Sequence, residues 1–244
     1  MLVEEFRKKL VQLAAKHGFL DREVRVELKP LSSKEAIGTP ERDDFPLLKG
    51  KERLVEAQVA EGRGQAFTDA FSEYSGTLKE LLELDIADRF NCSLMVAAGN
   101  AMLRALAMVG ATLHCRDTAP GECALMLPGW IKEHYPDVKR IALVGLQPAM
   151  AEALSGKFEL RILDLDEDNI GSRRHGVTIE DGSQALGEAA QWADMILATG
   201  SSITNHSIDG IIAAAGDKPL VFFGVTIAGA AELLGLKRYC PLGR

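Results

Sequence analysis

The segment 114–123 carries the side chains best suited to hold a metal ion. His114, Cys115 and Cys123 offer an imidazole nitrogen and two thiol sulfurs, the donors that zinc and other late transition metals prefer. They could fill three of four tetrahedral positions, although no C-x-x-C pair is present and neighbours in an extended segment point to opposite faces. Both cysteines can instead pack as small apolar side chains while His114 forms a loop hydrogen bond. Both interpretations stay open.

A second candidate site is the hydroxyl-rich segment that follows the apolar run 195–198. The candidate ligand-binding residues in this segment are Gly200, Ser201, Thr204 and Asn205. Hydroxyls and free backbone N–H groups at the end of a buried strand are where α/β sheets hold polar or anionic ligand groups. Asn205 or Ser207 can also cap a helix that begins at Ile208. The two roles are compatible.

The apolar run 140–144 ends at Gly145, which predicts a buried parallel strand turning toward a helix. A G-x-G-x-x-G loop needs two more glycines, and their absence argues against a nicotinamide dinucleotide cofactor. Asp164 stands where such folds place an acidic residue on a ribose hydroxyl. With the acidic residues after it, Asp164 can equally form a solvated turn. A ligand of the adenosylmethionine type demands less of the glycine loop and remains an alternative.

From residue 139 onward, strand-like and helix-like segments alternate, which predicts a parallel α/β domain. The expected strands are 140–144, 160–163, 195–198 and 220–224, and the expected helices are 149–154, 184–192 and 208–215. The carboxyl ends of parallel strands share one edge of the sheet, where ligands bind. We therefore expect Gly145, Asp164, the 199–205 segment and Thr226 to line one rim.

The first half predicts a smaller α+β domain, with a helix over 3–17, a strand at 23–28, a long loop or flap over 30–50, and a hairpin of strands 53–59 and 64–68. A helix is expected after Ser75 or Thr77, either of which can cap it, with Glu80 placed as in a capping box, and a second helix is expected over 92–109. The chain is thus expected to divide into domains 1–112 and 113–244. Asn100 lies in a hydrophobic helix and must find a partner or face the cleft between the domains. Glu73 precedes the capped helix and offers a carboxylate to the same cleft.

Composition excludes several classes of function. The chain has 28 basic and 35 acidic residues, a net charge of -7, and no Lys/Arg-rich run, so no nucleic-acid partner is expected. No stretch approaches the roughly 20 apolar residues of a membrane span, and the first residues lack the apolar core of a signal peptide. Four scattered cysteines suit a reducing compartment, and we expect a cytoplasmic protein. The apolar stretch 233–236 belongs either to a homodimer surface or to the core.

Three segments resemble the heavy-metal chelation family, whose domains have no assigned function. They are Gly200-Ser201-Ser202-Ile203-Thr204-Asn205 with Ser207-Ile208-Asp209, the string Glu73 to Leu82, and Ala97 to Ala101. The resemblance implies an enolase-N-terminal-like domain followed by a Rossmann-like domain, with a metal-related site in the cleft between them. This chain departs from the family at 224–226, where Gly-Val-Thr replaces Gly-Pro-Ser.

The hypothesis from the sequence is therefore a protein that binds a small polar or anionic ligand, or a transition metal or metal complex, in the interdomain cleft. The alternative is a transferase-like enzyme with an adenosylmethionine-like or nucleotide-like cofactor on the rim. A non-enzymatic sensor that holds a small molecule without turnover is a third hypothesis.

Overall fold

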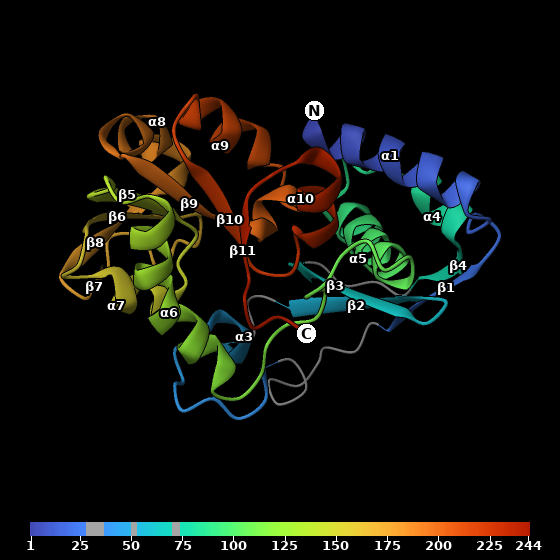
Figure 1. Ribbon diagram of the computed structural model, residues 1–244, viewed down its shortest axis with the longest axis horizontal. Helices are drawn as coiled ribbons and strands as arrows, with labels where there is room; N and C mark the ends of the chain where they lie inside the picture. Colours follow the sequence, from blue (N-terminus) through green and yellow to red (C-terminus); the bar gives the residue numbers. More distant parts are fainter. Residues whose placement is uncertain (28–36, 50–52, 70–73) are drawn as a thin grey trace.

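The computed structural model describes residues 1–27, 37–49, 53–69 and 74–244 (Figure 1). Residues 30–36 and 50 of the predicted loop 30–50, and the predicted site residue Glu73, lie outside the described residues. The chain forms a mixed α/β structure with a four-stranded sheet in its first half and a seven-stranded sheet in its second half.

The first sheet is antiparallel, in the order β3-β2-β1-β4. Its strands are β1 (Glu23–Glu27), β2 (Arg53–Val59), β3 (Gly62–Thr68) and β4 (Ser75–Thr77). The predicted hairpin is present, with Val59 opposite Gly62 across the turn. Helix α4 (Leu78–Glu83) begins with the predicted capping box, in which Thr77 and Glu80 bind each other's backbone N–H groups.

Helix α5 (Arg89–Ala105) lies between this sheet and helix α1 (Leu2–Lys16), as Figure 1 shows. Two glycines of β3 allow close contact, since a Cβ at Gly64 would lie 2.3 Å from the backbone nitrogen of Ala101. On the opposite side of α5, a Cβ at Gly99 would lie 2.7 Å from Leu10 Cδ1. Residues 92–103 of α5 are all buried because the helix is covered from both sides.

The second sheet has the order β11-β10-β9-β5-β6-β8-β7. Its parallel strands are β5 (Arg140–Val144), β6 (Glu159–Asp164), β8 (Val177–Asp181), β9 (Met195–Thr199), β10 (Leu220–Phe223) and β11 (Arg238–Tyr239), and the short β7 (Arg173–Arg174) pairs antiparallel with β8. The first parallel strand is central, and the chain adds strands on one side and then on the other. This is the order of doubly wound sheets that bind ligands at the reversal point.

Helices cover both faces of this sheet. Helices α6 (Ala119–His134) and α7 (Pro148–Leu154) share one core with Ile141 and Leu143, while α8 (Gly182–Trp192) and α9 (Ile208–Ala215) share the other with Ala142. Successive β5 side chains thus enter opposite cores, which is why the strand is apolar throughout. The predicted strands and helices of this half are confirmed, and β7, β8 and β11 are additional.

One hydrophobic core joins the two halves. Phe6 of α1 and Phe222 of β10 belong to the same cluster, and α10 (Ala228–Leu234) packs on α1 and α5. The chain end returns to the middle of the sequence, where Leu113 and Arg244 exchange two backbone hydrogen bonds of 2.8 and 2.9 Å. Leu233, Leu234 and Leu236 pack partly buried against this core. Among the described helices, none has the length and apolar character required to cross a membrane.

Candidate functional site

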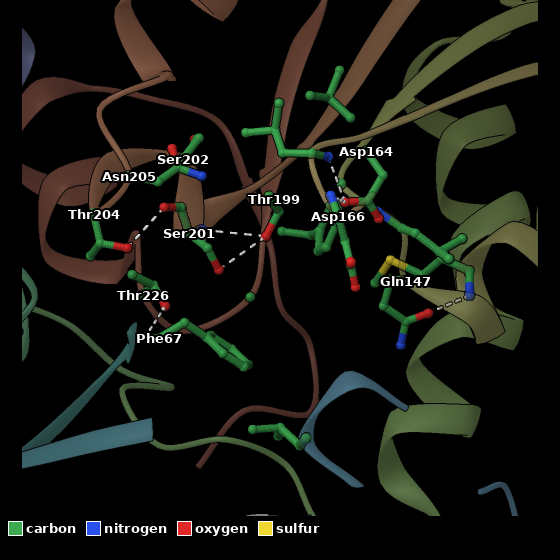
Figure 2. Close-up of a pocket in the computed structure, with 18 of the residues that line it drawn as sticks. Phe67, Gln147, Asp164, Asp166, Thr199, Ser201, Ser202, Thr204, Asn205 and Thr226 are labelled. Atoms are coloured by element: carbon green, nitrogen blue, oxygen red, sulfur yellow. Dashed lines mark hydrogen bonds between the residues drawn. The ribbon is translucent and has the colours of Figure 1, made fainter. Parts of the chain in front are cut away.

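A cavity of about 720 Å³ lies between the N-terminal sheet and the carboxyl edge of the parallel sheet. Both halves of the chain contribute to its wall: Phe67, Thr68, Asp69 and Arg89 from the first, and the loops after β5, β6, β9 and β10 from the second. Figure 2 shows Ser201, Ser202, Thr204 and Asn205 on one side of this space, Asp164, Asp166 and Gln147 on the other, and Thr199 between them. Most of the predicted rim therefore lines one cavity, whereas the predicted residue Gly200 is not among the lining residues.

The centre of the site is the contact between Gly145 and Thr199, which end the neighbouring strands β5 and β9. Gly145 has a φ of +88°, and a Cβ added there would lie 2.6 Å from Thr199 Cγ2. The chain leaves β5 toward α7 and β9 toward α9, which pack on opposite faces of the sheet. Such a divergence opens the crevice in which doubly wound proteins bind ligands.

The loop after β9 is ordered by its own hydroxyl and amide groups. It opens with a 3-10 turn, η1 (Gly200–Ile203), whose Ser201 N–H donates to Thr199 Oγ1 at 3.3 Å. Thr204 Oγ1 donates to the Ser201 carbonyl at 2.9 Å. Asn205 Oδ1 accepts from the backbone N–H of Ser207 at 3.0 Å just before α9, so Asn205 binds the free N–H group ahead of that helix. The loop is thus a preformed element of the wall.

Ser202 differs from Ser201, Thr204 and Asn205. Its side chain is 1% exposed and lines the cavity, yet its Oγ has no hydrogen-bond partner among the described residues. A buried hydroxyl that forms no hydrogen bond costs about 1–3 kcal/mol relative to one that does. Among the residues of this loop that line the cavity, Ser202 Oγ is therefore the buried group that a ligand or a water would satisfy.

Asp164 ties two loops together. Its carboxylate accepts four hydrogen bonds, from the backbone N–H groups of Leu146, Leu165 and Asp166 and from the side chain of Asn169, at 2.6 to 3.2 Å. Nearby, Gln147 Oε1 caps the start of α7. Asp164 thus holds the loops after β5 and β6 together at the cavity edge, whereas its position in the sequence predicts a contact with a ribose hydroxyl.

Thr226 and Asn100 join the halves of the chain beside the cavity. Thr226 lines it, and its Oγ1 accepts from the backbone N–H of Phe67 at 3.1 Å. Asn100 is fully buried behind the wall, where its Nδ2 donates to the carbonyls of Gln65, Val225 and Thr226. Asn100 therefore positions the loop after β10 and is not among the residues that line the cavity.

His114, Cys115 and Cys123 also line the cavity, and Cys240 joins them. Burial raises the pKa of both Cys115 and Cys123 to about 12, and the neighbouring Cys240 thiol adds to each shift. Burial lowers the pKa of His114. Its Nδ1–H donates to the Cys115 carbonyl at 2.6 Å, which leaves Nε2 as the nitrogen with a lone pair.

These groups are not arranged as a preformed metal centre. Within the described ranges, no three or more His, Cys, Asp or Glu side chains converge in a geometry that could hold a metal ion. The ligand set His114, Cys115 and Cys123 accordingly stays a prediction. The sequence gives no signal that Cys240 joins this group, because it lies more than 100 residues from Cys123 and reaches the cavity through the pairing of β11 with β10.

The charge of the described wall is acidic. It contains Asp44, Asp69, Asp164 and Asp166 against Arg89, whose guanidinium already pairs with Asp69 at 3.1 Å. A phosphate group would find no unpaired guanidinium or ammonium group among the described lining residues. This charge balance agrees with the missing glycines in disfavouring a dinucleotide.

The fold and the cavity define a two-part α/β protein with a cavity at the carboxyl edge of its parallel sheet. Residues 131–236 match the model of the DUF364 family, described as "Putative heavy-metal chelation". The match confirms, over that part of the chain, the family resemblance of the sequence. No curated protein matches the sequence.

Two solved structures of DUF364 proteins of unknown function share the fold. The protein from Pyrococcus horikoshii is 19% identical with a TM-score of 0.57, over 93% of this chain and 80% of its own. The protein from Desulfitobacterium hafniense DCB-2 is 13% identical with a TM-score of 0.50, over 75% of this chain and 72% of its own. At these identities the likeness concerns the fold alone.

Proposed function

We propose that this protein binds a small polar ligand in the cavity between its two halves, as a complex with a transition-metal ion. The observation that carries the proposal is Ser202, whose buried and unpartnered hydroxyl faces a 720 Å³ cavity at the reversal point of the sheet. Among the buried side-chain nitrogen and oxygen atoms of the described cavity wall, Ser202 Oγ is the one without a hydrogen-bond partner, which leaves it for the ligand. The volume suits a ligand of ordinary cofactor size.

The metal part of the proposal is supported by a second group of residues that line the cavity. Cys115, Cys123 and Cys240 line one wall with His114, and thiolate and imidazole are the ligands of soft and borderline cations. An acidic, cation-poor lining favours a positively charged complex over a phosphorylated compound. In this proposal an organic chelator fills most coordination positions and the protein adds the remaining donors. That division agrees with the absence of a complete ligand set among the described residues.

The test is elemental analysis of protein purified without a histidine tag, by inductively coupled plasma mass spectrometry, together with native mass spectrometry for a retained organic ligand. The variant is Cys115→Ser/Cys123→Ser, and Cys92→Ala is the control because Cys92 is buried in α5 and does not line the cavity. We expect near-stoichiometric metal in the wild type and in Cys92→Ala, and its loss in the double variant. Wild-type protein that holds no metal after loading with zinc, nickel, cobalt or iron would refute the metal part.

A separate result tests the organic ligand. If Ser202 binds it, Ser202→Ala purified in the same way retains less of the non-covalent mass than the wild type does. Ser155→Ala is the matched control, since Ser155 Oγ donates to the Ala151 carbonyl at 2.7 Å and lies outside the cavity wall. Equal retention by both variants would remove Ser202 from the site.

A further inference from the structure

The cavity is covered on one side by residues 37–49, which we call the flap. Ile37, Asp44, Phe45 and Leu47 of the flap line the cavity. The apolar members of this set are buried, and they share a core cluster with Cys123 and residues of α6 and α7. The short helix α3 (Pro46–Lys49) ends the flap and lies beside the lower end of α6 in Figure 1. The flap thus belongs to the first half of the sequence but packs on the second.

One end of the flap is fixed by Asp117. The Asp117 N–H donates to the Ile37 carbonyl at 2.7 Å, and its Oδ1 accepts from the Thr39 N–H at 2.9 Å. Gly38 and Asp117 both have positive φ values, +76° and +58°. A Cβ at Gly38 would lie only 2.2 Å from Asp117 Oδ1, so this close approach requires glycine. Asp117 lies two residues after Cys115 in the chain, so this contact is close to the cysteine side of the site.

The flap also contacts helix α7, through an exposed ion pair. Arg42 binds Asp44 within the flap through two hydrogen bonds of 2.9 and 2.8 Å. Arg42 Nη1 also donates to Glu152 Oε2 of α7. The side chains of Arg42 and Glu152 are 28% and 52% exposed, so water competes for both partners. The Asp44 contact holds Arg42 in position, and the Glu152 contact joins flap to helix.

We propose that the flap is a gate over the cavity, hinged at the Gly38–Asp117 contact and latched by the ion pair between Arg42 and Glu152. When the ion pair breaks, Phe45 and Leu47 leave the core cluster that they share with residues of α6 and α7, and the cavity wall that includes Cys115 and Cys123 becomes exposed. An exposed ion pair is the weakest kind of latch, which suits a segment that opens and closes while the rest of the fold stays intact. The gate does not depend on which ligand the cavity holds.

The test measures how fast each cysteine reacts with iodoacetamide at fixed pH, resolved by peptide mass spectrometry. Glu152→Gln removes the latch and leaves the pair of Arg42 with Asp44. We expect Cys115 and Cys123 to react roughly two- to five-fold faster than in the wild type, the change that the loss of an exposed ion pair produces in an opening equilibrium. Cys92, buried in α5, reports global unfolding and should react at its wild-type rate.

Two comparisons make the result decisive. Glu122→Gln removes a carboxylate next to Cys123 without touching the latch, so it controls for a direct effect of charge on thiol reactivity. Unchanged rates at Cys115 and Cys123 in Glu152→Gln, or the same acceleration in Glu122→Gln, would overturn the gate. Equal acceleration at Cys92 would also overturn it, because the thiols would then react through unfolding of the whole protein.

Discussion

Asn100 Oδ1 accepts a hydrogen bond of 2.7 Å from the backbone N–H of Gly229, which lies 129 residues further along the chain. The Nδ2 of the same side chain donates to three backbone carbonyls, two of them in the loop after β10. A Cβ at Gly229 would lie 2.8 Å from Asn100 Oδ1, so the contact needs both residues. One buried amide thus fixes α10 and the cavity loop to α5.

Replacing this amide should weaken the whole protein. Asn100→Ala leaves the Gly229 N–H buried without a partner, and we expect the free energy of unfolding to fall by about 3 kcal/mol in urea titrations. Asn91→Ala removes an exposed amide bonded to the Asp85 carbonyl and should change it by less than about 0.5 kcal/mol. Equal effects of the two substitutions would contradict the role of Asn100.

The close contact between Gly145 and Thr199 leads to a second prediction. Gly156→Ala introduces a side chain at a φ of +75° with nothing within 4 Å, so it measures backbone strain alone, about 1 kcal/mol. Gly145→Ala adds a clash with Thr199 to a similar strain, and should cost about 1–3 kcal/mol more in thermal or urea unfolding. If the two variants are equally stable, β5 and β9 tolerate a wider separation than the structure has.

Replacing Ser202 should not lower the unfolding free energy, unlike the replacement of most buried polar residues. In ligand-free protein, Ser202→Ala removes an unsatisfied buried hydroxyl and should leave the unfolding free energy unchanged or raise it by up to about 1 kcal/mol. Ser155→Ala removes a hydroxyl that is already hydrogen-bonded and should lower it by about 1 kcal/mol. A marked loss of stability in Ser202→Ala would show that an ordered water or another group satisfies the hydroxyl.

The pair of Arg140 and Asp194 predicts a specific dependence of stability on pH. The hydrogen bonds from the Arg140 guanidinium hold the pKa of Asp194 at about 2, below its unfolded value near 3.9. A depressed folded pKa stabilises the protein above the unfolded pKa, and this contribution is lost as pH falls through the folded pKa. The difference in Tm between wild type and Asp194→Asn should therefore be largest above about pH 4 and shrink toward pH 2. A constant difference would contradict it.

The buried thiols predict how metal affinity varies with pH. Because the pKa of Cys115 and Cys123 is about 12, each thiol is protonated at neutral pH and must release a proton when it binds a metal. The apparent affinity for cadmium or zinc, measured by competition with a chelating dye at pH 6.5, 7.5 and 8.5, should rise about tenfold per pH unit for each thiol bound. A pH-independent affinity would place the metal away from these thiols.

The local elements follow from the sequence alone. The apolar periods predict the helices, the run 140–144 ending in glycine predicts β5, and Thr77 with Glu80 predicts the capped start of α4. These signals are local because backbone geometry sets which side chains share a face. Strand β8 was predictable in principle, since apolar Val177 and Ile179 alternate with polar Thr178 and Glu180 between two glycines.

One further rule predicts which residues lie together at the edge of the parallel sheet. Once the second half is recognised as a parallel sheet, its strands must end at a common edge, so Gly145, Asp164, Thr199 and Thr226 are expected together. The structure places all four at one cavity. The sequence also shows that the glycine loop of a dinucleotide site is missing, because that requirement is a matter of residue type.

Only the tertiary structure decides what each polar residue does there. Asp164 binds backbone N–H groups, Asn100 joins the two halves behind the wall, and Ser202 is left without a partner, although all three are equally polar in the sequence. Cys240 reaches the cavity because β11 pairs with β10. Sequence periods describe the faces of single elements, whereas hydrogen-bond partners and burial depend on how distant elements pack, and that packing determines which groups remain for a ligand.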